Sequence, residues 1–174
     1  LIGLGGLCTD YAFLRDAIRI IRSIDARIPI VLGGQIVTND AEFIYENLQP
    51  DYAIVGEAEQ AFVELAHLGG DGGGTKIVYS DYVNNLDSIP FPDYEPFGVQ
   101  DMLDNHSMDT RLLYRYSRPN PRPFNIVASR SCPFTCTFCV HGRRDMPYRA
   151  RSIENIMREI KESYDKYKFN ILII

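Results

Sequence analysis

The sequence lacks the features of several large protein classes. No apolar run approaches the ~18–20 residues that a helix needs to cross a bilayer, so we expect no membrane span. Four cysteines in 174 residues are too few for a disulfide scaffold. No charged segment precedes the apolar run at residues 1–7, which therefore does not resemble a secretory signal. Internal repeats are also absent. We expect a cytoplasmic protein.

What is present is an ordinary folded composition. The chain is 45% hydrophobic and 24% charged, which argues against a disordered tail. Its length allows one domain or two small ones. Because it begins with Leu1 inside an apolar run, we expect it to be a piece of a longer protein.

Charge is distributed unevenly along the chain. Residues 1–110 carry five Lys and Arg against 18 Asp and Glu, whereas residues 111–174 carry 13 against five. This shift predicts two units of different character. The acidic part excludes nucleic-acid binding, and the basic part suits either a phosphate backbone or a bound anion. We expect a small-molecule substrate, whose identity the sequence does not give, and no nucleic-acid partner.

Hydrophobic periodicity in the first 68 residues predicts alternating strands and helices. Apolar runs indicate buried strands at 1–7, 28–32 and 52–55, and helical spacing indicates helices at 11–24, 41–48 and 57–68. Asp40 has the character of a helix N-cap. This order, with its short connections, predicts a parallel sheet covered by helices, a truncated doubly wound α/β domain.

The periodicity fails between residues 69 and 122, which we interpret as a linker with a short strand at 77–79. Residues 123–174 then predict a second unit, an unfinished β-loop-α-β. Its parts are a strand at 124–129, a cysteine-bearing loop at 130–150, a helix capped by Ser152 and a strand at 170–174. The predicted apolar face of that helix consists of Ile153, Ile156, Met157, Ile160 and Tyr164.

Three of the four cysteines crowd into eight positions. Cys132, Cys136 and Cys139 form a C-x3-C-x2-C pattern directly after a predicted strand. Three thiolates on one loop can converge on one metal centre, and three ligands leave one iron of a four-iron cluster open. Zinc is an alternative, because His141 would complete a Cys3His site. Three ordinary thiols are the other alternative. Cys8 is interpreted as a small buried hydrophobic residue.

The cysteine pattern, with a strand before it and the segment from Tyr148 (YRARSIENI) after it, resembles the radical S-adenosylmethionine enzymes. That resemblance implies that the three cysteines hold a [4Fe–4S] cluster whose open iron chelates S-adenosylmethionine, with Phe138 near the adenine. It also implies a partial barrel fold and an electron donor such as flavodoxin or ferredoxin. In that family, reduction of the cluster cleaves S-adenosylmethionine to methionine and a 5′-deoxyadenosyl radical.

The first half resembles the cobalamin-binding domain often fused ahead of such a barrel. The resemblance rests on residues 31–40 (VLGGQIVTND) and 51–62 (DYAIVGEAEQAF), and residues 86–93 (LDSIPFPD) match the linker of such fusions. It implies a corrin at the carboxyl edge of the sheet, near Gly33, Gly34, Gly56 and Glu57. Glycines at strand ends let a flat macrocycle approach the backbone. The family's Asp-x-His-x-x-Gly segment, whose His can ligate cobalt, is absent.

These resemblances imply three parts: a cobalamin-binding-like domain at 1–68, a linker at 69–122 and the start of a radical enzyme barrel at 123–174. The expected function is radical S-adenosylmethionine chemistry, such as methyl transfer or a ring or oxidative rearrangement. We expect this piece alone to be inactive, and no catalytic residue is assigned. The alternatives are an enzyme resembling tRNA methylthiotransferases and a non-enzymatic zinc module.

Overall fold

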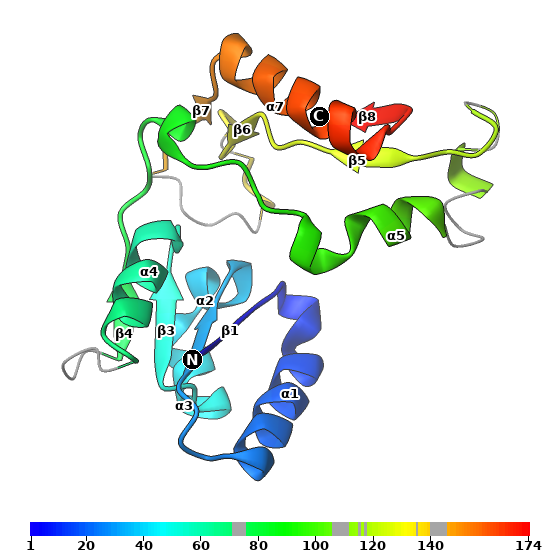
Figure 1. Ribbon diagram of the computed structural model, residues 1–174. Helices are drawn as coiled ribbons and strands as arrows, with labels where there is room; N and C mark the ends of the chain where they lie inside the picture. Colours follow the sequence, from blue (N-terminus) through cyan, green and yellow to red (C-terminus); the bar gives the residue numbers. More distant parts are fainter. Residues whose placement is uncertain (71–75, 106–111, 115, 117, 135, 140–145) are drawn as a thin grey trace. The chain divides into compact units, whose positions relative to one another are not determined.

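The computed structural model describes residues 1–70, 76–105, 112–114, 116, 118–134, 136–139 and 146–174 (Figure 1). The chain divides into two compact units. Unit 1 comprises Leu1–Val83 and Phe134–Met146, and unit 2 comprises Asn84–Pro133 and Pro147–Ile174. Among the described residues, no helix is long and apolar enough to cross a membrane.

Unit 1 contains a parallel four-stranded sheet. Its strands follow the chain in the order β1-β2-β3-β4. The strands are β1 (Ile2–Gly5), β2 (Ile30–Gly33), β3 (Tyr52–Val55) and β4 (Ile77–Tyr79). The helices are the 3₁₀ turn η1 (Cys8–Asp10), α1 (Tyr11–Ile24), α2 (Gln35–Asn39), α3 (Ala41–Leu48) and α4 (Glu59–His67). The predicted parallel sheet with covering helices is confirmed.

Helices cover both faces of this sheet because successive strand residues point to opposite sides. Ile30 and Leu32 of β2 pack with buried residues of α1, α2 and α3. Val31, between them, packs instead with Ala61 and Leu65 of α4. Both faces of β2 and β3 are therefore buried, as the continuous apolar runs in the sequence predict.

Local signals set the ends of these helices. The Asp40 side chain accepts a hydrogen bond from the Phe43 N–H at 3.2 Å, and α3 begins at the next residue. Helix α3 ends at Gln49, which adopts the left-handed conformation (φ 51°). The predicted ranges of α1, α3, β3 and β4 are confirmed.

Unit 2 contains two short strands that pair in parallel and a helix that lies between them in the chain. β5 (Pro123–Asn125) pairs with β8 (Ile171–Ile173). The helix α7 (Ile153–Tyr167) precedes β8 in the chain. β6 (Ser129–Arg130) pairs antiparallel with β7 (Arg149–Ala150). The described part of unit 2 also contains η2 (Leu86–Ser88), η3 (Glu95–Phe97) and α5 (Val99–Asp104). The predicted strand–loop–helix–strand order is present.

The core of unit 2 is largely aromatic. Phe124 stacks on Phe169 with ring centroids 4.8 Å apart, and Tyr167 and Tyr94 contact the same ring. Leu103 of α5 is buried in the same cluster. Residues from the 69–122 segment thus contribute to this core, while the predicted boundaries of the linker stay a prediction.

Two details of unit 2 correct the sequence-based expectations. The strand predicted at 124–129 is split into β5 and β6, because the carbonyls of Val127 and Ala128 accept hydrogen bonds from Arg151. The predicted apolar face of α7 is correct only in part: Ile160 packs against the aromatic core and Ile156 is half-buried, whereas Ile153 is 75% exposed and Met157 and Tyr164 are exposed too. The buried residues of α7 are Asn155, Glu159, Ser163 and Tyr167.

Candidate functional site

The carboxyl ends of β1, β2 and β3 bring the predicted cofactor glycines together. Gly33 ends β2 opposite Gly5 of β1, Gly34 precedes α2, and Gly56 follows β3. The Thr38 hydroxyl links these turns: it donates to the Gly34 carbonyl at 3.1 Å and accepts from the Gly56 N–H at 3.1 Å. The edge is therefore a fixed, glycine-lined surface.

Two of these glycines serve different purposes. Gly34 has φ 85°, and a Cβ there would stand 2.9 Å from the Gly6 nitrogen, so close backbone packing alone requires glycine. A Cβ at Gly33 would meet only the Ile54 carbonyl oxygen at 3.8 Å, an ordinary contact. The protein's own packing does not require glycine at Gly33, and the missing side chain leaves room for a flat ligand. The edge fits a corrin in this respect.

Glu57, the fourth residue predicted at this edge, has a structural contact. Its carboxylate accepts a hydrogen bond from the Val83 N–H at 2.7 Å. That contact ties the turn after β3 to the segment after β4. Helix α4 accordingly begins at Glu59 rather than at the predicted Glu57.

The three clustered cysteines lie between β6 and β7. All are free and exposed, and Phe138 is 87% exposed. The Cys139 N–H donates to the Cys136 carbonyl at 3.1 Å, so these two residues stand at the ends of one tight turn. Free thiols three residues apart in a closed turn match the donor chemistry of an iron–sulfur or zinc site.

The structure does not gather the cysteines around one point. In the part of the chain that is described, no group of three or more His, Cys, Asp or Glu side chains could hold a metal ion. His141, the fourth ligand of the zinc alternative, lies outside the described residues. Cys8 is exposed, so its interpretation as a buried residue is wrong, because it follows the carboxyl end of β1 rather than lying inside the sheet.

Unit 2 also contains a cavity of about 190 Å³ with charged groups in its wall. Arg151 and Glu159 form an ion pair there, and their side chains are only 11% and 3% exposed. The Tyr94 hydroxyl donates to Glu159 Oε1 at 3.3 Å. Burial, and then the nearby Glu159 carboxylate, raise the pKa of Tyr94 to about 12.

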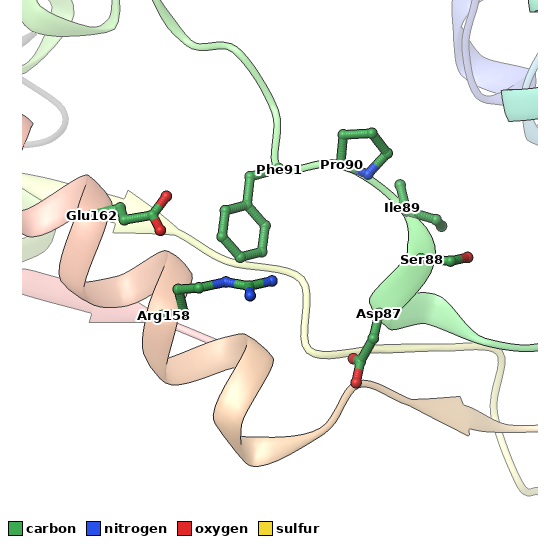
Figure 2. A pocket seen from close by; sticks show the side chains of 7 residues that line it. All are labelled: Asp87, Ser88, Ile89, Pro90, Phe91, Arg158 and Glu162. Atoms are coloured by element: carbon green, nitrogen blue, oxygen red, sulfur yellow. The ribbon is translucent and has the colours of Figure 1, made fainter.

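The segment after η2 packs against α7 beside this cavity. The Ser152 N–H donates to Asp87 Oδ1 at 2.9 Å, and the hydrogen bonds from Ser152 lower the pKa of Asp87. Figure 2 shows the Phe91 ring beside the Arg158 guanidinium. The guanidinium carbon lies 5.0 Å from the ring centroid, and both side chains line a surface hollow of about 390 Å³. The Arg151 guanidinium carbon lies 5.4 Å from the same ring.

Sequence reasoning did not single out Thr38, Arg151, Glu159 or Tyr94. Thr38 stands four residues after Gly34, so a helix begun at the glycine turn returns its hydroxyl to that turn. No spacing in the sequence indicates that Arg151 and Glu159 form an ion pair, because their pairing depends on how α7 packs.

Comparison with known proteins agrees with the geometry of unit 1. Residues 1–66 match the family model of the B12 binding domain. The chain is also similar to an uncharacterized methyltransferase of Pyrococcus horikoshii, PH0819, with 26% identity over 170 residues. That match covers 86% of this chain but 33% of the relative, so the chain spans about a third of the relative's length. No solved structure matches the chain significantly.

Proposed function

We propose that this chain belongs to a cobalamin- and iron–sulfur-dependent radical S-adenosylmethionine enzyme that transfers methyl groups. The observation that carries the proposal is that one chain contains two candidate cofactor-binding regions. One is the glycine-lined edge of unit 1, in the region that matches B12 binding domains. The other is the set of three free, exposed thiols between β6 and β7.

Each predicted residue has a role in this proposal. Cys132, Cys136 and Cys139 hold the [4Fe–4S] cluster, and the exposed Phe138 ring seats the adenine of S-adenosylmethionine. When bound, the cluster supplies one electron to the sulfonium through its open iron. An electron donor such as flavodoxin or ferredoxin reduces the cluster.

The corrin lies against Gly33, Gly34, Gly56 and Glu57 at the carboxyl edge of the sheet, where open α/β sheets bind ligands. The backbone at this edge orients the corrin, and Thr38 holds the two turns in register. Methyl transfer is favoured over other radical reactions because the relative from Pyrococcus horikoshii is named a methyltransferase. We expect the substrate to be a small molecule.

Anaerobic reconstitution with iron and sulfide tests the cluster assignment. We expect about four iron ions per chain and a brown chromophore, both lost in Cys136→Ala. Cys8→Ala is the matched control, because Cys8 is also free and exposed but lies outside the C-x3-C-x2-C pattern. Stoichiometric tetrahedral zinc that depends on His141 would instead support the zinc module and overturn the cluster.

Titration with hydroxocobalamin tests the corrin surface. Because a Cβ at Gly33 meets nothing closer than 3.8 Å, Gly33→Ala should fold normally yet bind cobalamin about tenfold more weakly, about 1.4 kcal/mol. Ala26→Val adds a larger volume, at an exposed position before β2, and should leave the affinity unchanged. Equal affinities for all three proteins would place the corrin elsewhere.

A further inference from the structure

The cavity of about 190 Å³ lies within unit 2, and three separate parts of the chain form its wall. Residues from 86–94 contribute mostly apolar side chains, and residues from 125–130 contribute the stretch of β5 and β6. Arg151 and Glu159 complete the wall. Because a water molecule occupies about 30 Å³ of liquid, this volume equals that of about six waters. It suits a ligand of about six to eight non-hydrogen atoms.

The residues of the wall differ in exposure, so the cavity has an inner end and a rim. Leu86 and Glu159 are buried. Asn125, Val127 and Pro92 are exposed. A ligand can therefore enter from the exposed side and reach polar groups that solvent contacts little.

Arg151 has an unused hydrogen-bond donor in this wall. Its Nε donates to Asn155 Oδ1 at 2.7 Å, and its Nη1 donates to the Val127 carbonyl at 3.0 Å. The same Nη1 pairs with Glu159. The Nη2 nitrogen is buried and has no hydrogen-bond partner among the residues that the structure describes. A buried charged donor without an acceptor costs free energy, which an oxygen atom of a ligand would recover.

The charges of the wall favour an anion over a cation. Among the described residues that line the cavity, Arg130 and Arg151 carry positive charge and Glu159 alone carries negative charge. Both oxygens of Glu159 are already engaged, since Oε1 accepts from the Tyr94 hydroxyl and Oε2 accepts from Arg151. Arginine binds carboxylates through two parallel N–H groups. A carboxylate is therefore the ligand group that this wall fits best.

The apolar part of the wall is held in place by its own contacts. The Phe91 ring has the guanidinium carbons of Arg151 and Arg158 at 5.4 Å and 5.0 Å from its centroid. The Asp87 carboxylate ties the same segment to the start of α7 by accepting from the Ser152 N–H. A preformed apolar wall with a few polar groups is typical of small-molecule sites.

We propose that this cavity binds a small carboxylic acid in its ionised form. The carboxylate accepts hydrogen bonds from the Arg151 guanidinium, and the hydrocarbon body lies against Ile89 and Phe91. This site requires neither the corrin nor the iron–sulfur cluster, so its failure and the failure of the proposed function are separate outcomes.

Nuclear magnetic resonance titration of the full 174-residue chain with sodium hexanoate tests the site. For a ligand with about eight non-hydrogen atoms, we expect chemical-shift changes that saturate with a dissociation constant of about 1 mM. Hexanamide has the same size but no charge, so it should bind at least about tenfold more weakly. Chemical shifts that do not saturate with hexanoate, or equal binding of hexanamide, would overturn the proposal.

Two variants of the wall locate the bound hexanoate. Arg151→Lys keeps a positive charge beside Glu159 but loses the planar pair of donors, so the affinity should fall about tenfold. Ile89→Phe fills part of the cavity from a half-buried position and leaves the ion pair intact. It should also weaken binding about tenfold, and it decides the matter if Arg151→Lys does not fold.

Arg158→Met is the matched control for the loss of charge. Arg158 lines the neighbouring surface hollow but not this cavity, so the variant should bind hexanoate with wild-type affinity. Wild-type affinity in whichever of the two wall variants folds would overturn the proposal. A loss in Arg158→Met as large as that in the wall variants would place hexanoate in the surface hollow, which also overturns it.

Discussion

The two units bury different kinds of side chains. Both faces of the sheet in unit 1 are covered by aliphatic side chains such as Leu32 and Ile54. In unit 2 the helix α7 buries Asn155, Glu159 and Ser163 and exposes Ile153 and Met157. Unit 1 is thus organised by aliphatic periodicity, whereas unit 2 combines an aromatic core with a buried ion pair and its hydrogen bonds on α7.

Removing one charge of that pair should have the largest effect. Glu159→Ala leaves the Arg151 guanidinium buried without its carboxylate, which costs about 3–5 kcal/mol. Hydrogen exchange of peptides from β5 and α7 measures the loss within unit 2. Glu162→Ala, on the exposed side of the same helix, should change exchange little. Equal effects of the two substitutions would contradict a stabilising role of the buried ion pair in unit 2.

A substitution that creates a cavity in the core of unit 1 should have the next largest effect on stability. Leu32 is fully buried, so Leu32→Ala removes packing against α1, α2 and α3 and costs about 2–5 kcal/mol. Exchange of peptides from β2 and α1 reports the loss, which should not depend on pH. Ile20→Ala, at an exposed position of α1, provides the comparison. If the Ile20 substitution proved the more destabilising of the two, the assignment of this core would be wrong.

The ion pair between Asp51 and Arg22 in unit 1 should make its stability depend on pH. Burial acts to raise the pKa of Asp51, but the Arg22 guanidinium at 2.6 Å and the Ile30 N–H at 2.7 Å outweigh burial and lower the pKa. A lowered pKa contributes stability above the unfolded value near 3.9, and that stability is lost as pH falls through the folded value.

Asp51→Asn should therefore destabilise unit 1 by about 1–2 kcal/mol at pH 7. The difference from the wild type should shrink below about pH 4. Denaturant unfolding across this pH range measures it. Asp16→Asn, at an exposed carboxylate, should change the stability little, because solvent screens such surface pairs. A difference that persists undiminished at pH 2 would exclude the Asp51 charge as its source.

Replacing Tyr94 should have the smallest effect on stability at neutral pH and the clearest effect at alkaline pH. Its pKa is raised to about 12 in the folded protein, above the ordinary value near 10. The unfolded chain releases this proton first, so stability falls as pH rises from about 10 to 12. Tyr94→Phe should lose that part of the alkaline decline. An unchanged alkaline profile in the variant would show that Tyr94 does not contribute.

The same contrast explains how much the sequence could predict. In unit 1 the ranges of α1, α3, β3 and β4 follow from apolar spacing and the Asp40 cap, because tertiary packing there agrees with local preference. In unit 2 the buried face of α7 could not be predicted, because periodicity does not register a Glu159 that is buried by pairing with Arg151. At the candidate site, the glycine turns were visible in the sequence, whereas Thr38 and Arg151 depend on contacts made across turns.

The most direct test of the central claim is the electron paramagnetic resonance spectrum of the reduced, reconstituted protein before and after S-adenosylmethionine is added. The account predicts the signal of a single [4Fe–4S] cluster, absent in Cys136→Ala, whose g values shift when the nucleoside binds to the open iron. A protein that gives no cluster signal, or one whose signal is indifferent to S-adenosylmethionine, would contradict it.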